Sequence, residues 1–283
     1  RINLTPGPTM PVEQFILTAD RIREAGHLIY DNPWIPKVRW PESSQIHGDD
    51  SGPTPAQLPF LLYFGVEAFF GGAAGPGKSW ALLASAAMFV DRPNYHALLL
   101  RRTYADLAKP GALIDRAKQW WLNSNAKWSD KEKKWTFPSG ATISFGYLEH
   151  EDDKYQYQSA EYQFIGFDEL TQFSETQYLY LFSRLRKLED SDIPLRMRSA
   201  SNPGGPKGGR GHEWVKTRFV DPESAQAPFF RGILKDNFFL DRKQYLQSLS
   251  HLDPVTRGQL ERGDWSSVPG GRFFREWFKK YRC

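Results

Sequence analysis

Short runs of consecutive apolar residues alternate, along the central part of the chain, with segments whose apolar residues recur at helical spacing. Runs of this length between glycines and prolines predict buried strands, and the spaced segments predict amphipathic helices. Their alternation indicates an α/β fold with a mostly parallel central sheet flanked by helices. The predicted strands are 61–70, 95–101, 162–167 and 195–200, with a hairpin inside 134–145, and the predicted helices are 78–90, 112–122 and 174–187.

The two ends of the chain differ from this alternating part. Helical spacing within residues 10–30 is followed by a loop rich in proline, serine and glycine. Beyond Pro222 a short strand precedes two helices, the second of which begins at Pro254 behind the N-cap residue Asp253. We therefore expect a helical leader and arm at 1–50, a core at 51–222, a small C-terminal helical lid at 223–265 and a linker at 266–283.

Composition excludes several classes of protein. The 283 residues suit one large domain with a small appendage. Aromatic residues make up 15% of the chain, which argues against disorder. The single cysteine, Cys283, excludes a disulfide framework and a cysteine-based zinc site. The longest apolar stretch is interrupted by Glu67 and is too short to span a bilayer. The net charge of +4 is only a weak indication of a polyanionic partner.

The segment Gly72-Ala73-Ala74-Gly75-Pro76-Gly77-Lys78-Ser79 matches the phosphate-binding pattern G-x-x-x-x-G-K-[ST], between a predicted strand and a predicted helix. Glycines let the backbone curl so that its N–H groups point at phosphate oxygens, and the helix start adds its positive dipole end. Lys78 would then reach the β- and γ-phosphates and the Ser79 hydroxyl would bind Mg²⁺. A glycine-rich turn that binds nothing is the alternative. The predicted ATP-binding residues are Gln57, Gly72, Ala73, Ala74, Gly75, Pro76, Gly77, Lys78, Ser79 and Trp80.

Two carboxylates follow the apolar strand that ends at Phe167. In this Walker B arrangement Asp168 would hold Mg²⁺, and Glu169 would polarise the water that attacks the γ-phosphate. We therefore expect Glu169 and Lys78 to be catalytic and the cofactors to be ATP and Mg²⁺. The Gln57 amide could donate to and accept from an adenine edge at once, although it could equally be an exposed loop residue.

Taken together, these motifs resemble the ATPase domain of the large terminase subunit of tailed bacteriophages. The resemblance runs from about Pro53 to Phe278. Beyond the phosphate turn it rests on Pro55-Ala56-Gln57, Leu100-Arg101-Arg102-Thr103, Phe137-Pro138-Ser139-Gly140-Ala141-Thr142-Ile143, Gly166-Phe167-Asp168-Glu169-Leu170-Thr171-Gln172-Phe173, Phe182-Ser183-Arg184-Leu185-Arg186, Ser201-Asn202-Pro203-Gly204-Gly205, Gly263-Asp264-Trp265 and Gly270-Gly271.

The resemblance implies a P-loop NTPase of the additional-strand (ASCE) type that hydrolyses ATP to move double-stranded DNA into a procapsid. It implies a ring, expected to be a pentamer, on the portal protein, with the small terminase subunit as a further partner and no membrane. The location would be the host cell cytoplasm, transiently on the procapsid. The nuclease domain of the family would follow the linker and be missing here, so no DNA cutting is expected from this chain.

Ser201, Asn202 and Pro203 resemble the family motif that couples hydrolysis to motion. Their side chains could contact the γ-phosphate, its water or Glu169, so that loss of the phosphate would rotate the attached subdomain. An ordinary strand-ending turn is the alternative reading.

The sequence departs from the family where an arginine is expected. Many members carry one in the phosphate turn, where Ala73 and Ala74 stand here. Others carry one shortly before Walker B, where this chain reads Tyr155-Gln156-Tyr157-Gln158. The arginine-finger candidates, each by default a surface residue, are Arg101, Arg102, Arg184 and Arg186. Two other functions stay open: another nucleic-acid-stimulated ATPase such as a helicase, and a non-catalytic ATP-binding assembly module.

Overall fold

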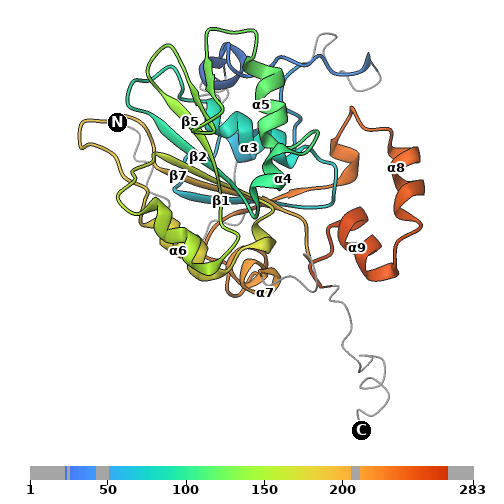
Figure 1. Cartoon of the computed structure of the whole chain (residues 1–283). Coiled ribbons are helices and arrows are strands. Elements are labelled where there is room, and N and C mark those ends of the chain that lie inside the picture. The colour runs from blue at the N-terminus through green and yellow to red at the C-terminus, as the bar shows by residue number, and fades with distance from the viewer. Residues whose placement is uncertain (1–22, 24–25, 43–50, 205–210, 267–283) are drawn as a thin grey trace.

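The computed structural model describes residues 23, 26–42, 51–204 and 211–266, and within them eight strands form one sheet (Figure 1). Predictions that concern residues 10–22, Gly205, 270–278 and Cys283 lie outside this description. The strands are β1 Glu67–Gly72, β2 His96–Arg101, β3 Lys127–Ser129, β4 Lys134–Thr136, β5 Thr142–Tyr147, β6 Phe164–Asp168, β7 Arg196–Ser201 and β8 Phe229–Gly232.

The strand order is β3-β4-β5-β2-β6-β7-β1-β8. From β5 to β8 all neighbours are parallel, and only β3 and β4 add antiparallel pairs at one edge. The predicted α/β fold with a mostly parallel sheet is therefore confirmed. Strand β7 lies between β1, which leads into the phosphate turn, and β6, which ends in Asp168. It is the additional strand that the ASCE type implies. Because parallel strands end at the same edge, Gly72, Asp168 and Ser201 meet there, where α/β sheets bind their ligands.

Helices cover both faces of the sheet, with α3 and α5 on one side and α6 and α7 on the other (Figure 1). Both faces of β2 are consequently buried: Ala97 and Leu99 belong to the core under α3, and Leu98 and Leu100 to the core over α6. The α-helices are α2 Leu58–Leu61, α3 Lys78–Ala87, α4 Tyr104–Ala108, α5 Leu113–Trp121, α6 Glu175–Phe182, α7 His212–Val215, α8 Arg242–Leu249 and α9 Pro254–Arg262. The 3₁₀ segments are η4 Glu151–Tyr157, η5 Leu170–Gln172 and η7 Leu234–Asp236, and the π-helical ones are η2 Gly26–Tyr30 and η6 Lys216–Val220.

The predicted strand 61–70 is wrong in its first half. The apolar run begins with helix α2, which carries Pro59 in its first turn, and the strand starts only at Glu67. Proline fits the first turn of a helix, and a short apolar run does not by itself distinguish helix from strand.

The predicted helix 174–187 is too long. It ends at Phe182 because the following residues pair instead with Tyr162, whose N–H donates to Arg184 O and whose carbonyl accepts from Arg186 N. Helix α4, begun by the N-cap Thr103, and strand β3 were not predicted.

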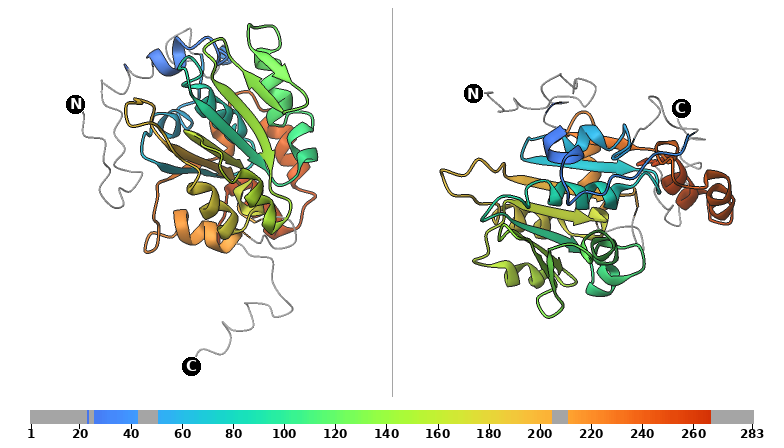
Figure 2. Two further views of the ribbon diagram at one scale, coloured as in Figure 1. Left: turned by 60° about the vertical axis from the view of Figure 1, so that its left-hand side comes forward. Right: turned by 90° about the horizontal axis from the view of Figure 1, so that it is seen from above.

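The two C-terminal helices, α8 and α9, lie together beside the sheet and project from one side of the molecule (Figure 2). Helix α9 contacts the phosphate turn directly, since Ala74 N donates to Leu260 O at 2.7 Å. None of the helices in the described ranges is long and apolar enough to cross a membrane.

Candidate nucleotide site

The turn between β1 and α3 has the backbone conformation that its glycines permit. Gly72, Gly75 and Gly77 have φ angles of 128°, 90° and 81°, in the region that disfavours residues with a Cβ. A Cβ on Gly72 would also collide with the Gly232 carbonyl oxygen. Gly77 is the N-cap of α3, so the first N–H groups of that helix open toward the end of the sheet.

These elements border a cavity of about 540 Å³ at the carboxyl ends of the strands. The turn and the start of α3 form one wall. The residues directly after β6 and β7, one residue of α5, the arm before α2 and the segment before α8 complete the lining. The lining residues are Val38, Gly52, Thr54, Gln57, Ala74, Gly75, Gly77, Lys78, Ser79, Trp80, Arg116, Glu169, Asn202, Asn237 and Phe239.

Lys78 is buried at the base of this cavity. Its ammonium donates to Ala73 O at 2.5 Å and to Asn202 Oδ1 at 2.6 Å. Burial lowers the pKa of Lys78 to about 8, although the charges of Glu169 and Asp168 oppose the shift. The lysine is therefore a cation at neutral pH that has exchanged water for two protein acceptors.

Ser79 and Asp168 lie face to face, as the sequence predicts. Ser79 Oγ donates to Asp168 Oδ1 at 3.1 Å, and the Asp168 side chain is only 2% exposed. A hydroxyl and a carboxylate are the oxygen ligands that suit Mg²⁺, which takes one or two protein ligands alongside substrate phosphates. The described residues contain no group of three or more acidic, histidine or cysteine side chains placed to hold a metal. The pair fits a cation that shares its coordination with phosphate oxygens.

Glu169 follows Asp168 with a left-handed backbone, φ 59°, which an ordinary side chain adopts only at a cost of about 1–3 kcal/mol. Burial raises the pKa of Glu169, Asp168 raises it further, and Lys78 and Arg101 lower it. Ser201 Oγ donates to Glu169 Oε2 at 3.4 Å and also lies 2.9 Å from Thr171 Oγ1. The half-buried Glu169 side chain lines the cavity beside the predicted coupling turn.

Gln57 has both ends of its amide engaged with the protein. Its Oε1 accepts from Thr54 N at 2.8 Å and its Nε2 donates to Gly77 O at 3.0 Å. Only 5% of the residue is exposed, so it is not the surface glutamine of the alternative reading. In this structure Gln57 ties the arm to the phosphate turn, and its contact with an adenine edge stays a prediction.

The four arginine candidates occupy different places. Arg101 lies in the site, where its Nε donates to Asp168 Oδ2 at 2.7 Å. Arg102 donates to Leu148 O at 2.8 Å and to Gln177 Oε1 at 3.3 Å, so it joins the segment after β5 to helix α6.

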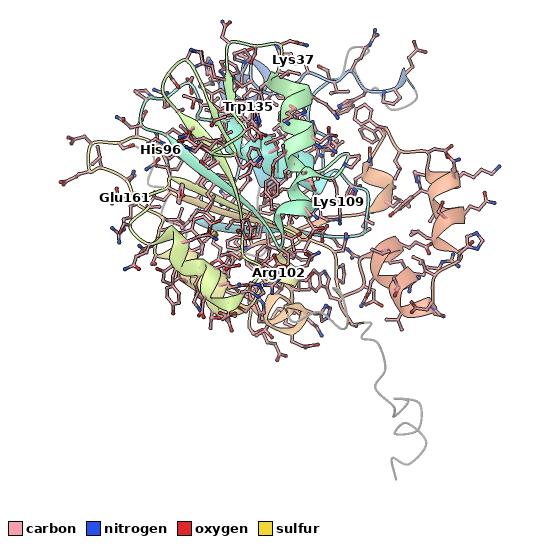
Figure 3. All side chains as sticks on the ribbon, viewed as in Figure 1. Lys37, His96, Arg102, Lys109, Trp135 and Glu161 are labelled. Atoms are coloured by element: carbon pink, nitrogen blue, oxygen red, sulfur yellow. The ribbon has the colours of Figure 1, made fainter. Side chains whose placement is uncertain are left out.

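Arg184 and Arg186 flank Leu185. Leu185 pairs with Tyr162, which lies just before the start of β6. Asp168 ends β6, so at about 3.3 Å per residue the two arginines lie roughly 20 Å from it. Glu161, which pairs with Arg186 at 3.4 Å, lies on the side of the molecule opposite α8 (Figure 3). At that separation both arginines lie away from the cavity of their own chain, whose lining includes neither of them.

Sequence reasoning missed several residues of the cavity. Arg116 comes from α5, Asn237 and Phe239 from the segment before α8, and Val38 from the arm. None of them stands in a recognised motif, and no spacing signal marks them. They reach the site only through the tertiary fold.

Comparisons with known proteins agree with the fold and the motifs. The family model described as "Terminase large subunit, T4likevirus-type, N-terminal" matches residues 69–280. The large terminase of a thermophilic bacteriophage is 15% identical, with a TM-score of 0.60, over 75% of this chain and 53% of that one. Its complex with ATP-γ-S gives 15% identity and a TM-score of 0.59, over 75% of this chain and 52% of the other. The HK97 bacteriophage large terminase is 10% identical, with a TM-score of 0.56, over 82% of this chain and 54% of that one.

No curated protein matches the chain. The chain spans about half the length of the solved terminases, whose likeness at this identity shows a shared fold. The family model covers well over half of the chain and includes the phosphate turn, the Walker B strand and the turn after β7. The chain therefore belongs to the large terminase family and corresponds to its N-terminal part.

Proposed function

We propose that this chain hydrolyses ATP as the motor of viral genome packaging. The observation that carries the proposal is the meeting of Lys78, the Ser79–Asp168 pair and Glu169 at one cavity. A lysine for phosphates, two oxygen ligands for Mg²⁺ and a buried carboxyl are the groups that phosphoryl transfer to water requires. The large terminase of the thermophilic bacteriophage, which shares the fold, has been solved with ATP-γ-S and with ADP.

Each residue has a distinct task in this proposal. The backbone N–H groups at the start of α3 and the Lys78 ammonium bind the phosphate chain and compensate its charge. Ser79 and Asp168 would hold Mg²⁺, which when bound neutralises developing charge on the phosphoryl oxygens. Glu169 orients the attacking water and accepts its proton, and its raised pKa makes the carboxylate a better base than an exposed glutamate.

The turn after β7 offers a route from the phosphates to the lid. Asn202 contacts Lys78, and two residues later Gly204 N donates to His212 Nδ1 at 2.9 Å. The other nitrogen of that buried ring, Nε2, lies 3.1 Å from Trp265 O, just beyond α9. A change at the phosphates would thus move the turn, His212 and the last residue of the lid, Trp265.

The wider assembly is proposed from the resemblance to the family. Double-stranded DNA is the proposed cargo, held mainly through its phosphates and so largely without regard to sequence. A ring, expected to be a pentamer, on the procapsid portal, the small terminase subunit as partner and a site of action in the host cytoplasm complete the proposal.

Two substitutions test the site. Lys78→Ala should abolish ATP binding because the phosphates lose their buried cation. Glu169→Gln should bind ATP with near-normal affinity but hydrolyse it at least about a hundredfold more slowly, because the general base is lost. Equilibrium binding and steady-state turnover measure both, with the exposed Glu149→Gln as control. Normal turnover in Glu169→Gln would remove that residue from the mechanism, and normal binding in Lys78→Ala would remove the site.

Turnover measured against protein concentration, with and without DNA, separates the candidate functions. A motor that needs a neighbour's arginine should show a steep rise with concentration and stimulation by DNA. Strand separation without a procapsid would favour a helicase. Undetectable hydrolysis at high concentration with DNA present would favour a module that binds ATP as a structural ligand.

A further inference from the structure

Arg116 is a cavity residue held in place by the packing of its helix. Helix α5 buries Ala117 and Trp121 in the core, and Trp120 contacts Trp80 of α3 edge to face, with ring centroids 5.5 Å apart. These contacts fix α5 against the helix that begins at the phosphate turn. The Arg116 side chain consequently lines the same cavity as Lys78 and Ser79.

The guanidinium of Arg116 is poorly compensated. Its Nε is buried and has no hydrogen-bond partner among the described residues. Its Nη2 makes only a long contact, 3.4 Å, with Gly111 O. Within the described ranges no carboxylate lies at ion-pairing distance from it, and burial lowers its pKa against the opposing charges of Asp168 and Asp115. The residue as a whole is half-buried, and a cation partly removed from water without a counter-ion is stabilised by a ligand that supplies negative charge.

The cavity offers few other cations to the phosphate groups of a bound nucleotide. Ala73 and Ala74 stand in the turn, and Arg101 is committed to Asp168 at 2.7 Å. Lys78 is the other cation among the lining residues. A nucleoside triphosphate carries several negative charges, and guanidinium groups bind phosphate oxygens through paired, charge-assisted hydrogen bonds.

We propose that Arg116 binds the phosphate chain of the nucleotide within its own subunit, as the cation that this phosphate turn lacks. The inference rests on the proposed function and adds a residue from α5 to it. Arg116 acts in cis because it lines the cavity of its own chain. An arginine supplied by a neighbouring subunit would act in addition to Arg116.

The test compares Arg116→Gln with Lys118→Gln, which removes the same charge from the same helix. Lys118 lies over the Trp128 ring, 5.4 Å from its centroid, and does not line the cavity. With a fluorescent ATP analogue and unlabelled ATP as competitor, Arg116→Gln should bind about ten- to a hundredfold more weakly. Lys118→Gln should stay within about twofold of the unchanged protein, and Arg116→Lys should recover part of the loss. Affinity of Arg116→Gln within twofold of the unchanged protein would overturn the inference.

A second measurement uses the unaltered chain and does not depend on how a variant folds. Phenylglyoxal modifies arginines, and mass spectrometry follows each site. ATP should slow the modification of Arg116 at least about fivefold while leaving remote Arg186 unchanged; equal rates at Arg116 with and without ATP would overturn the inference. If the unaltered chain binds no ATP, or Lys78→Ala binds it normally, the proposed function itself fails, and that result is distinct from normal binding by Arg116→Gln alone.

Discussion

The ammonium of Lys78 donates a hydrogen bond to the side-chain oxygen of Asn202, with 2.6 Å between Nζ and Oδ1. The bond joins the first residue of α3 to the turn that follows β7, across 124 positions of sequence. The lysine that should bind phosphate is thus already engaged by the turn that should sense it. A phosphate group that recruits Lys78 would compete with Asn202 for the ammonium, so we expect this contact to change when nucleotide binds.

Replacing Asn202 by alanine should therefore separate binding from turnover. Without Asn202, Lys78 has one competing partner fewer, so ADP should bind as tightly as before or up to about tenfold more tightly. ATP turnover should fall at least about tenfold because the turn no longer responds to the lysine. Calorimetry with ADP and a steady-state assay measure the two effects, with the exposed Asn123→Ala as control. A clear loss of ADP affinity would show that Asn202 serves binding instead.

Nucleotide binding should weaken in alkaline solution. The pKa of Lys78 lies at about 8 because the ammonium is buried, so this group loses its charge as pH rises through 8 instead of near 10.5. Affinity for ATP should be nearly constant from pH 6.5 to 7.5 and fall toward about tenfold per unit above pH 8. In Lys78→Arg the guanidinium stays charged over this range, so any binding that remains should lack the decline. A decline of the same size in that variant would assign the effect to another group.

The same burial has a consequence for folding. The pKa of Lys78 is lower in the folded state than in the unfolded chain, so below pH 8 the charged lysine disfavours folding. This penalty is relieved as pH rises from 8 toward 10.5. The melting-temperature difference between the unchanged protein and Lys78→Met should therefore shift in favour of the unchanged protein between pH 7 and 9.5. A difference that is independent of pH would contradict the assignment.

The sequence predicted the parts of the site whose chemistry is local. A turn that cradles phosphate needs its glycines, lysine and serine in consecutive positions, and the Walker B carboxylates directly follow their strand. Arg116 and Asn237 carry no such constraint, because a residue from any element that passes the cavity could fill their places. Such residues become visible only when helix packing and strand order are known.

The elements of the fold were likewise predictable where the signal is local and were misplaced where distant residues decide. Strands buried on both faces, such as β2 and β6, read as unbroken apolar runs and were placed within two residues. The apolar run before β1 was misread because continuity of apolar residues says nothing about helix or strand. The end of α6 was misplaced because a pairing with Tyr162, twenty residues earlier, ended it. Long-range pairing is the information that a local pattern lacks.

Replacing Arg198 should lower the free energy of unfolding strongly. Arg198 is fully buried in β7, and its guanidinium donates to the carbonyls of Tyr63, Gly65 and Val66 in the loop before β1. Arg198→Met would leave the carbonyls of Tyr63 and Gly65 without this donor, whereas Val66 O still accepts from Met197 N. The free energy of unfolding should therefore fall by about 3–5 kcal/mol. Urea unfolding at pH 7 measures it. Arg186→Met removes an exposed ion pair and should cost under about 1 kcal/mol; similar losses in both variants would contradict the role of the carbonyls.

Gly263, just after α9, lets the lid approach the phosphate turn. Its φ is 64°, and a Cβ there would lie 2.5 Å from both Ala73 N and Gly72 C. Gly263→Ala must therefore push α9 away from the turn and break the 2.7 Å bond from Ala74 N to Leu260 O.

Gly111→Ala is the matched control, because Gly111 has a similar φ of 75° but nothing within 4 Å of an added Cβ. Both variants carry the cost of a left-handed alanine, about 1 kcal/mol, and Gly263→Ala alone carries the collision. Gly263→Ala should melt several degrees below Gly111→Ala and bind ATP at least about tenfold more weakly, since the turn loses its support from the lid. Equal melting temperatures and equal ATP affinities in the two variants would show that the lid does not hold the phosphate turn in place.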